Sequence, residues 1–283
     1  MLNLTQQINA AVADPYVQGV VITHGTDTLE ETAFFTALTT RTEKPIVIGQ
    51  FNCVFKCLYY TCKFTFIAIG TKISTVGAMR PATAISADGP ENLLAAVTLA
   101  ADPSAMGRGP MVVLNDRIGS AYFTTKTNAN QLDTFKAVEP GYLGYFINIK
   151  PKFYFPPSRP LGSQYFDISN ATELPQVDIL YGHQALNPAL VSASIESGAK
   201  GLVLAGMGAG GWTKPGRVAV TEAIGNGTIC VYSHRSQDGT VPASGEQTGI
   251  SSGLLNPQKS RIMLQLAINA GYSYNSTQTA FEI

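Results

Sequence analysis

Residues 23–28, with the sequence Thr-His-Gly-Thr-Asp-Thr, bring together side chains that can take part in chemistry. Thr26 offers a hydroxyl that becomes a nucleophile once a base removes its proton, and Asp27 offers a carboxylate that can hold an ammonium group. The same residue types are common at helix starts, where their oxygens accept hydrogen bonds from free backbone N–H groups. The segment therefore allows two interpretations, a reactive site or a helix-capping loop.

The flanking residues place this segment between a strand and a helix. Residues 19–23 are uncharged and rich in β-branched side chains, which predicts a short buried strand. Thr28 and Glu31 have the T-x-x-E spacing of a capping box, which predicts a helix that begins at Thr28. Open α/β sheets bind small ligands outside the carboxyl ends of their strands, so this position favours a binding site.

Strand and helix patterns alternate along the rest of the chain. Further strands are predicted at residues 44–48, 110–115, 177–181, 201–205 and 228–233, and helices at residues 4–13, from 88 onward, and at 190–197, 218–224 and 258–269. Residues 156–175 are rich in proline and lack an apolar period, which indicates a linker. The alternation predicts an α/β protein of two domains, residues 1–155 and 176–283, each with a mainly parallel sheet covered by helices.

The composition narrows the class of partner. The 283 residues carry a formal net charge of zero, with no basic stripe, so nucleic acid and anionic membranes are poor candidates. Charged residues make up 13% of the chain, against the ~25% typical of soluble domains. This low share suits buried parallel strands and a substantial subunit interface. The first residues lack the basic start and apolar run of a signal peptide.

The cysteines do not predict a metal site. Cys53, Cys57 and Cys62 lie within ten residues of one another, and Cys230 stands alone. Their spacing, with no histidine nearby, matches no zinc-binding pattern. We expect free thiols and no bound metal.

Four motifs together resemble those of the bacterial-type (type II-like) L-asparaginases, the asparaginase–glutaminase family. They are G-V-V-I-T-H-G-T-D-T-L at 19–29, V-G-A-M-R-P-A-T-A-I-S-A-D-G-P at 76–90, T-K-T-N at 125–128 and L-N-P-Q-K at 255–259. The first motif is the most specific of the four. The resemblance covers nearly the whole chain apart from residues 49–75.

The resemblance implies an amidohydrolase that converts L-asparagine to L-aspartate and ammonia, often with some activity on L-glutamine. It implies no metal, no organic cofactor, and a homotetramer whose sites are each closed by a neighbouring subunit. Sequons occur at Asn3, Asn170, Asn226 and Asn275. These sequons favour the secreted branch of the family, so we expect the intact form to be glycosylated and either secreted or associated with the cell wall.

Within this family the motif residues take distinct roles. Thr26 is expected to supply the hydroxyl, and Lys126 is expected to be the base that activates it. Burial favours the neutral form of a lysine amine, whereas a nearby carboxylate favours the charged form. Asp27 is expected to hold Lys126 and to accept the α-ammonium group of the substrate. Ala78 is expected to offer its backbone carbonyl to the substrate amide. His24, His183 and His234 are expected to be structural.

The chain also departs from the family pattern. The family carries an earlier T-G-G-T-[IV] motif with its first catalytic threonine, and a later Gly-Ser-Gln segment that binds the substrate carboxylate. Neither occurs upstream of Gly19, so we expect an N-terminally truncated sequence without that nucleophile. Residues 49–75 hold three cysteines and no acid, and we interpret them as a translated intron; a genuine surface excursion is the alternative.

A third departure lies in residues 206–211, G-M-G-A-G-G, where the family usually has an asparagine. Ala209 and Gly210 offer no amide side chain there, and Glu246 is aligned only loosely with the family's late acidic residue. The same residues form a G-x-G-x-x-G fingerprint, so a dinucleotide-binding protein is one alternative. Pro215, and the lack of an acid some twenty residues on, argue against it. The other alternative is an amino-acid-binding remnant without turnover.

Overall fold

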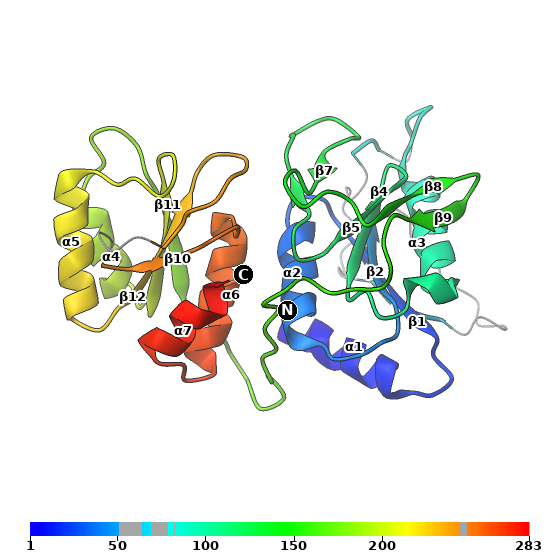
Figure 1. Ribbon diagram of the computed structural model, residues 1–283, viewed down its shortest axis with the longest axis horizontal. Helices are drawn as coiled ribbons and strands as arrows, with labels where there is room; N and C mark the ends of the chain where they lie inside the picture. Colours follow the sequence, from blue (N-terminus) through cyan, green and yellow to red (C-terminus); the bar gives the residue numbers. More distant parts are fainter. Residues whose placement is uncertain (51–63, 69–78, 82, 244–247, 283) are drawn as a thin grey trace. The chain divides into compact units, whose positions relative to one another are not determined.

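The computed structural model describes residues 1–50, 64–68, 79–81, 83–243 and 248–282. These residues form two compact units, Met1–Pro160 and Leu161–Ile283, whose elements are drawn in Figure 1. Each unit combines helices with a sheet that contains parallel strands, which confirms the predicted α/β class. The division between the units falls inside residues 156–175. Phe166, from that segment, is buried and contacts the ring of Tyr272 in the second unit.

The strand before Thr26 lies in the interior of the first unit's sheet, which has the order β3-β1-β2-β4-β5-β8-β9. The bounds of its parallel part are β1 Gly19–His24, β2 Ile46–Gln50, β3 Phe64–Ala68 and β4 Met111–Leu114. Val20, Val21 and Ile22 are fully buried, as expected for a strand that is covered on both faces. The predicted strand at residues 19–23 is therefore confirmed, with His24 added at its end.

Strand β3 belongs to the stretch interpreted as a translated intron. It pairs in parallel with β1, with Gly19 opposite Phe64 and Thr23 opposite Ala68. This part of residues 49–75 is therefore a strand at the edge of the sheet. The origin of the stretch stays a prediction, and Cys53, Cys57 and Cys62 lie outside the described residues.

The other half of this sheet is antiparallel, which the alternating pattern did not predict. The strands that follow β4 are β5 Arg117–Ser120, β8 Gly144–Ile147 and β9 Lys150–Phe153. The chain reverses between β4 and β5 at Asn115 and Asp116, whose φ angles are 50° and 59°. Two consecutive left-handed residues make the tight turn that suits the twist of a hairpin. The sheet of this unit is accordingly mixed.

Helices cover both faces of the first sheet, as Figure 1 shows. Their bounds are α1 Leu2–Ala13, α2 Leu29–Thr39 and α3 Gly89–Ala101, with a short 3-10 helix η1 at Pro103–Ala105. Ile8 of α1 and Leu29 of α2 share one apolar core with Ile22 and Ile48. Helix α3 packs on the opposite face, against Val21 of β1 and Val47 of β2. The alternation of side chains along buried strands thus builds two separate cores.

The start of α2 differs in one detail from the expected capping box. Thr28 occupies the N-cap position as predicted, but its side chain makes no capping hydrogen bond. Its backbone, with φ −123° and ψ 19°, departs from the extended conformation usual for an N-cap residue whose oxygen accepts from the first turn. The predicted helix start is right, and the predicted capping bond to the Thr28 side chain is wrong.

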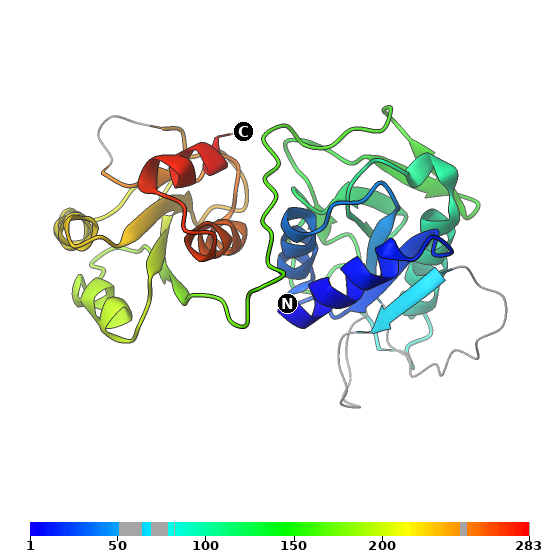
Figure 2. The same cartoon turned by 90° about the horizontal axis from the view of Figure 1, so that it is seen from below.

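The second unit has parallel strands in chain order, β10-β11-β12-β13. Its strands are β10 Val177–Tyr181, β11 Gly201–Gly206, β12 Ile229–His234 and β13 Ile250–Ser251, and its helices are α4 Ala189–Glu196, α5 Lys214–Gly225, α6 Pro257–Asn269 and α7 Tyr274–Phe281. Figure 2 shows α4 and α5 on one face, with α6 and α7 on the other. Asn256 caps α6 as predicted, because its Oδ1 accepts from the backbone N–H of Lys259 at 3.0 Å.

The glycine-rich loop after β11 corrects one argument from the sequence. Pro215 does not interrupt a helix there; it lies in the first turn of α5, whose N-cap Thr213 accepts from the N–H of Gly216. Proline is compatible with a first turn because its missing N–H has no partner there anyway. Between β11 and α5, Met207 and Gly211 exchange two backbone hydrogen bonds of 2.8 and 2.7 Å, which close the loop into a tight turn.

Trp212 follows this loop and is 4% exposed. Two glycines make room for its indole. A Cβ on Gly182 would lie 2.7 Å from Cζ3, and one on Gly216 would lie 2.6 Å from Nε1. Both distances are shorter than packed atoms allow, so the indole requires glycine at both positions.

Within the described part of the chain, no helix is long and apolar enough to cross a lipid bilayer.

Candidate functional site

Thr26 and Asp27 lie in the turn between β1 and α2, at the carboxyl end of the buried strand. The two neighbours differ in their surroundings. Thr26 is 6% exposed, whereas the side chain of Asp27 is 94% exposed. The hydroxyl is therefore shielded by the protein, and the carboxylate beside it faces solvent.

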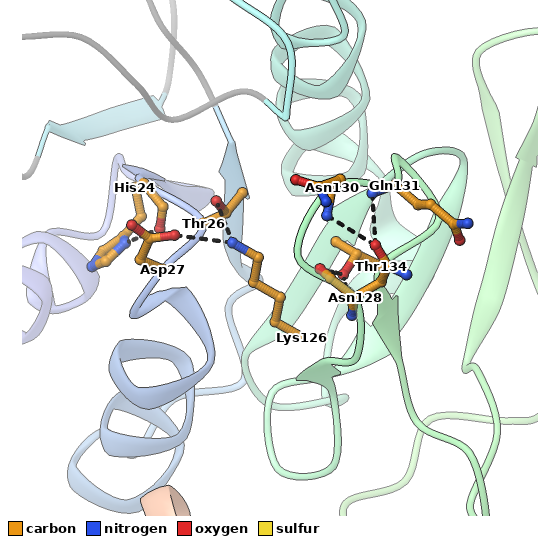
Figure 3. A network of polar contacts seen from close by, with 9 residues as sticks. His24, Thr26, Asp27, Lys126, Asn128, Asn130, Gln131 and Thr134 are labelled. Carbon is orange, nitrogen blue, oxygen red and sulfur yellow. Dashed lines mark hydrogen bonds and ion pairs between the residues drawn. The ribbon is translucent and has the colours of Figure 1, made fainter. Parts of the chain in front are cut away.

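Lys126 reaches this turn from a separate hairpin, as Figure 3 shows. It ends strand β6 (Thr125–Lys126), which pairs with β7 (Phe135–Lys136). Its Nζ donates to Thr26 Oγ1 at 3.1 Å and to Asp27 Oδ1 at 2.9 Å. The structure thus brings together the three residues that the sequence suggested as catalytic, across about a hundred positions of chain.

The loop that joins β6 to β7 is held by side-chain hydrogen bonds (Figure 3). Asn128 Oδ1 accepts from the backbone N–H groups of Asn130 and Gln131, at 2.8 and 3.0 Å. Thr134 accepts from the N–H of Asn128 at 2.8 Å and donates to the carbonyl of Asn128. Thr127 donates to the carbonyl of Thr134 at 2.8 Å. These bonds order the hairpin that presents Lys126, and they give T-K-T-N a structural as well as a chemical part.

Glu30 is a residue that the sequence analysis passed over. It lies in the first turn of α2, is 4% exposed, and accepts a hydrogen bond from the Thr125 hydroxyl. A glutamate in a first helical turn reads from sequence as an exposed residue that stabilises the helix dipole. Nothing in the local pattern distinguishes it from such an exposed residue, because its partner Thr125 is distant in sequence.

His24 ends β1 beside the site, and hydrogen bonds hold its ring. Nδ1 contacts the Gly25 carbonyl at 2.7 Å, and Nε2 contacts the Thr32 hydroxyl at 2.9 Å. Burial lowers the pKa of His24; the hydrogen bond to Gly25 and the charge of Glu31 oppose this effect without cancelling it. A neutral ring engaged at both nitrogens fits the structural role that the sequence predicted.

The arrangement of amine, hydroxyl and carboxylate suits proton transfer. The Lys126 side chain is 18% exposed and lies within hydrogen-bond distance of both oxygens. In its neutral form the amine can accept the hydroxyl proton of Thr26. The exposed carboxylate has room for a second cation, as the α-ammonium group of an amino acid requires. Among the described residues, no three His, Cys, Asp or Glu side chains are placed to hold a metal ion.

The remaining candidates belong to the second unit or lie outside the described residues. Ala78 and Glu246 belong to the latter group, so their roles stay predictions. His183 is exposed and His234 is buried, both in the second unit. Cys230 is a buried free thiol whose pKa is raised to about 12 by burial, which makes it a poor nucleophile.

Two family models match the chain. "Asparaginase, N-terminal" matches residues 1–50 and 58–159, and "Glutaminase/Asparaginase C-terminal domain" matches residues 176–281. The N-terminal match therefore resumes inside residues 49–75 and omits only 51–57 of them. The interpretation of that stretch as an insertion stays a prediction.

Curated proteins and a solved structure are similar over nearly the whole chain. "Probable L-asparaginase 1" of Schizosaccharomyces pombe is 51% identical, across 100% of this chain and 71% of that protein. "L-asparaginase 2-3" of Saccharomyces cerevisiae is 47% identical, across 99% and 72%. The crystal structure of "Probable Cytoplasmic L-asparaginase from Campylobacter jejuni" is 37% identical with a TM-score of 0.84, and the match covers 99% of this chain and 82% of that one.

Proposed function

The chain belongs to the asparaginase family of amidohydrolases, and on that premise we propose that it hydrolyses L-asparagine to L-aspartate and ammonia at Thr26, Asp27 and Lys126. One observation carries the proposal. The Lys126 amine lies 3.1 Å from the Thr26 hydroxyl and 2.9 Å from the Asp27 carboxylate. A hydroxyl with a proton acceptor at hydrogen-bond distance is the pairing that nucleophilic attack on an amide requires.

In the proposed reaction, neutral Lys126 takes the proton of the Thr26 hydroxyl as its oxygen adds to the side-chain carbonyl carbon of asparagine. The tetrahedral intermediate collapses when its C–N bond breaks, and the departing nitrogen takes the proton from Lys126 and leaves as ammonia. Water then adds to the resulting aspartyl ester, gives a proton to Lys126, and releases L-aspartate as the Thr26 oxygen recovers that proton. Asp27 orients Lys126 and binds the α-ammonium group, while Ala78 offers its carbonyl to the amide.

Ammonia release from L-asparagine tests this proposal. Thr26→Val should lower kcat by about 10⁴-fold or more, because the nucleophile and its proton are both lost. Thr26→Ser keeps the hydroxyl and should retain most of the activity. Lys126→Met should be inactive, whereas Lys136→Met, one strand away on β7, is the matched control and should keep the parent rate. An acid quench should trap an aspartyl ester, which peptide mass spectrometry locates on Thr26.

The same measurements distinguish the alternatives. A chain that binds L-aspartate but releases no ammonia from L-asparagine is the amino-acid-binding remnant. A Thr26→Val variant that turns over at the parent rate refutes the assigned nucleophile. L-glutamine is the proposed second substrate, and the ratio of the kcat/KM values for the two amides measures the preference.

The proposal extends to assembly and location. The resemblance to the family supports a homotetramer, and the low share of charged residues, 13%, suits an extensive subunit interface. Light scattering after size exclusion tests this directly. The asparagines of the four sequons, Asn3, Asn170, Asn226 and Asn275, are exposed, which supports a secreted glycoprotein. A shift in mass on endoglycosidase treatment of protein from the native host is the expected result.

A further inference from the structure

Glu30 occupies a position where a charged side chain is costly. It is 4% exposed, and a buried carboxylate is unfavourable unless hydrogen bonds or dipoles compensate for its lost hydration. Two compensating features are present. The N-terminal turn of α2 favours negative charge, and the hydroxyl of Thr125 donates to Oε2. The second feature joins α2 to another element of the fold.

Thr125 immediately precedes Lys126 on β6. That strand belongs to the small sheet β6-β7 and not to the main sheet that carries β1. The position of the Lys126 amine against Thr26 therefore depends on what fixes the β6 hairpin to the start of α2. The bond from Thr125 to Glu30 is such a connection, formed one residue before Lys126 on β6 and four residues after Thr26 on α2.

We propose that Glu30, through its hydrogen bond with Thr125, is a positioning residue that sets the distance between the Lys126 amine and the Thr26 hydroxyl. The inference rests on the proposed function for its catalytic consequence, but not for its geometry. Glu30 itself touches neither substrate nor reacting atoms. Its effect is to keep β6 in the place from which Lys126 contacts both Thr26 and Asp27.

Three single variants separate positioning from general stability. Thr125→Val removes the donor hydroxyl with little change in shape, and Thr125→Ser restores it. Thr36→Val is the matched control. Thr36, like Glu30, is buried on α2, but its hydroxyl donates to the backbone carbonyl of Thr32, 2.8 Å away in the same helix, and not to β6. A comparable loss of melting temperature is expected for the two valine variants.

The first readout is chemical labelling of lysine amines at fixed pH, followed by peptide mass spectrometry. Lys200, which is exposed in the second unit, serves as the internal reference. Thr125→Val should raise the labelling rate of Lys126 relative to Lys200 by about tenfold, because a hydrogen bond to a charged acceptor no longer holds β6. Thr125→Ser and Thr36→Val should keep the parent ratio. Glu30→Leu should match Thr125→Val, and the double variant should show no further rise.

The second readout is steady-state hydrolysis of L-asparagine. Thr125→Val should lower kcat by about tenfold and leave KM nearly unchanged, because Asp27 remains available to the substrate. An unchanged labelling ratio in Thr125→Val, or labelling effects that add in the double variant, overturns the positioning role. If the parent protein releases no ammonia while the labelling ratios behave as stated, the proposed function fails and the positioning role stands.

Discussion

Replacing Asp27 by asparagine removes the charge that faces Lys126 and keeps a side chain of nearly the same size. The side chain of Asp27 is 94% exposed, so water screens its ion pair with Lys126. An exposed pair of this kind contributes about 0–1 kcal/mol to the free energy of unfolding. Asp27→Asn should therefore leave the protein folded, with a loss of stability below about 1 kcal/mol.

The expected effect on substrate is larger. A hydrogen bond between a carboxylate and an ammonium group contributes roughly 1.5–3 kcal/mol. Its loss should weaken binding of L-aspartate and raise the KM for L-asparagine by about 10- to 150-fold. Discrimination provides a sharper test. The parent enzyme should prefer L-asparagine over succinamic acid, which lacks the α-amino group, and Asp27→Asn should lose most of that preference.

Urea unfolding followed by circular dichroism and calorimetric titration with L-aspartate measure the two effects separately. Asp133→Asn is the control, because Asp133 also forms a solvent-exposed ion pair, 3.1 Å from Lys136. It should match Asp27→Asn in stability and the parent in binding. Unchanged L-aspartate affinity in Asp27→Asn would refute the ammonium-binding role. A stability loss above about 2 kcal/mol in this variant alone would show a structural role instead.

Three further predictions concern stability and reactivity. The pKa of His24 is lowered by burial, so the unfolded chain takes up a proton more readily than the folded protein as the pH falls below 6.5, and the free energy of unfolding should fall with the pH. In urea unfolding this fall should be less steep for His24→Gln, and equal slopes would refute the lowered pKa. Burial raises the pKa of Cys230 from 9.0 to about 12, so in the folded protein it should be alkylated at pH 8 roughly 10³-fold more slowly than a free thiol. Unfolding in urea should remove this protection, and rapid alkylation of Cys230 in the folded protein would contradict its burial. Gly19→Ala should lower the free energy of unfolding by about 1–3 kcal/mol, because the new Cβ would lie 2.6 Å from the Ala100 carbonyl oxygen. Gly225 has open space around it, so Gly225→Ala should raise the free energy of unfolding by no more than about 1 kcal/mol. Equal losses for the two variants in urea unfolding would refute the packing argument.

Parts of the fold were predictable because they follow from local patterns. The uncharged, β-branched residues 19–23 require burial on both sides, and Asn256 followed by Pro257 specifies a helix start. The antiparallel extension was not predicted because it depends on turns with unusual backbone angles. Asn115 is a common residue for a left-handed turn, and N-D between two apolar runs was a usable signal. Ile149, with φ 62° in the turn between β8 and β9, gives no such signal because a β-branched residue rarely adopts that angle.

The candidate site divides in the same way. Thr26 and Asp27 could be placed from sequence at the end of a strand, where ligands bind in open sheets. Lys126 was suggested only by resemblance to the family, since no local pattern links positions 26 and 126. Glu30 was missed because the hydrogen bond that its carboxylate accepts comes from Thr125 on β6, which is distant in sequence. Long-range contacts of this kind have no periodic signature along the chain.

Trp212 has a spectroscopic consequence. It is the single tryptophan of the chain, and it is held in an apolar setting by Gly182 and Gly216 in the second unit. Excitation at the red edge of protein absorbance therefore reports on that unit alone, with emission at short wavelength while the indole is shielded from water. The tyrosines lie in both units, so their signal reports on the whole chain. A difference between the two signals during unfolding would show, without any introduced label, whether the units melt separately.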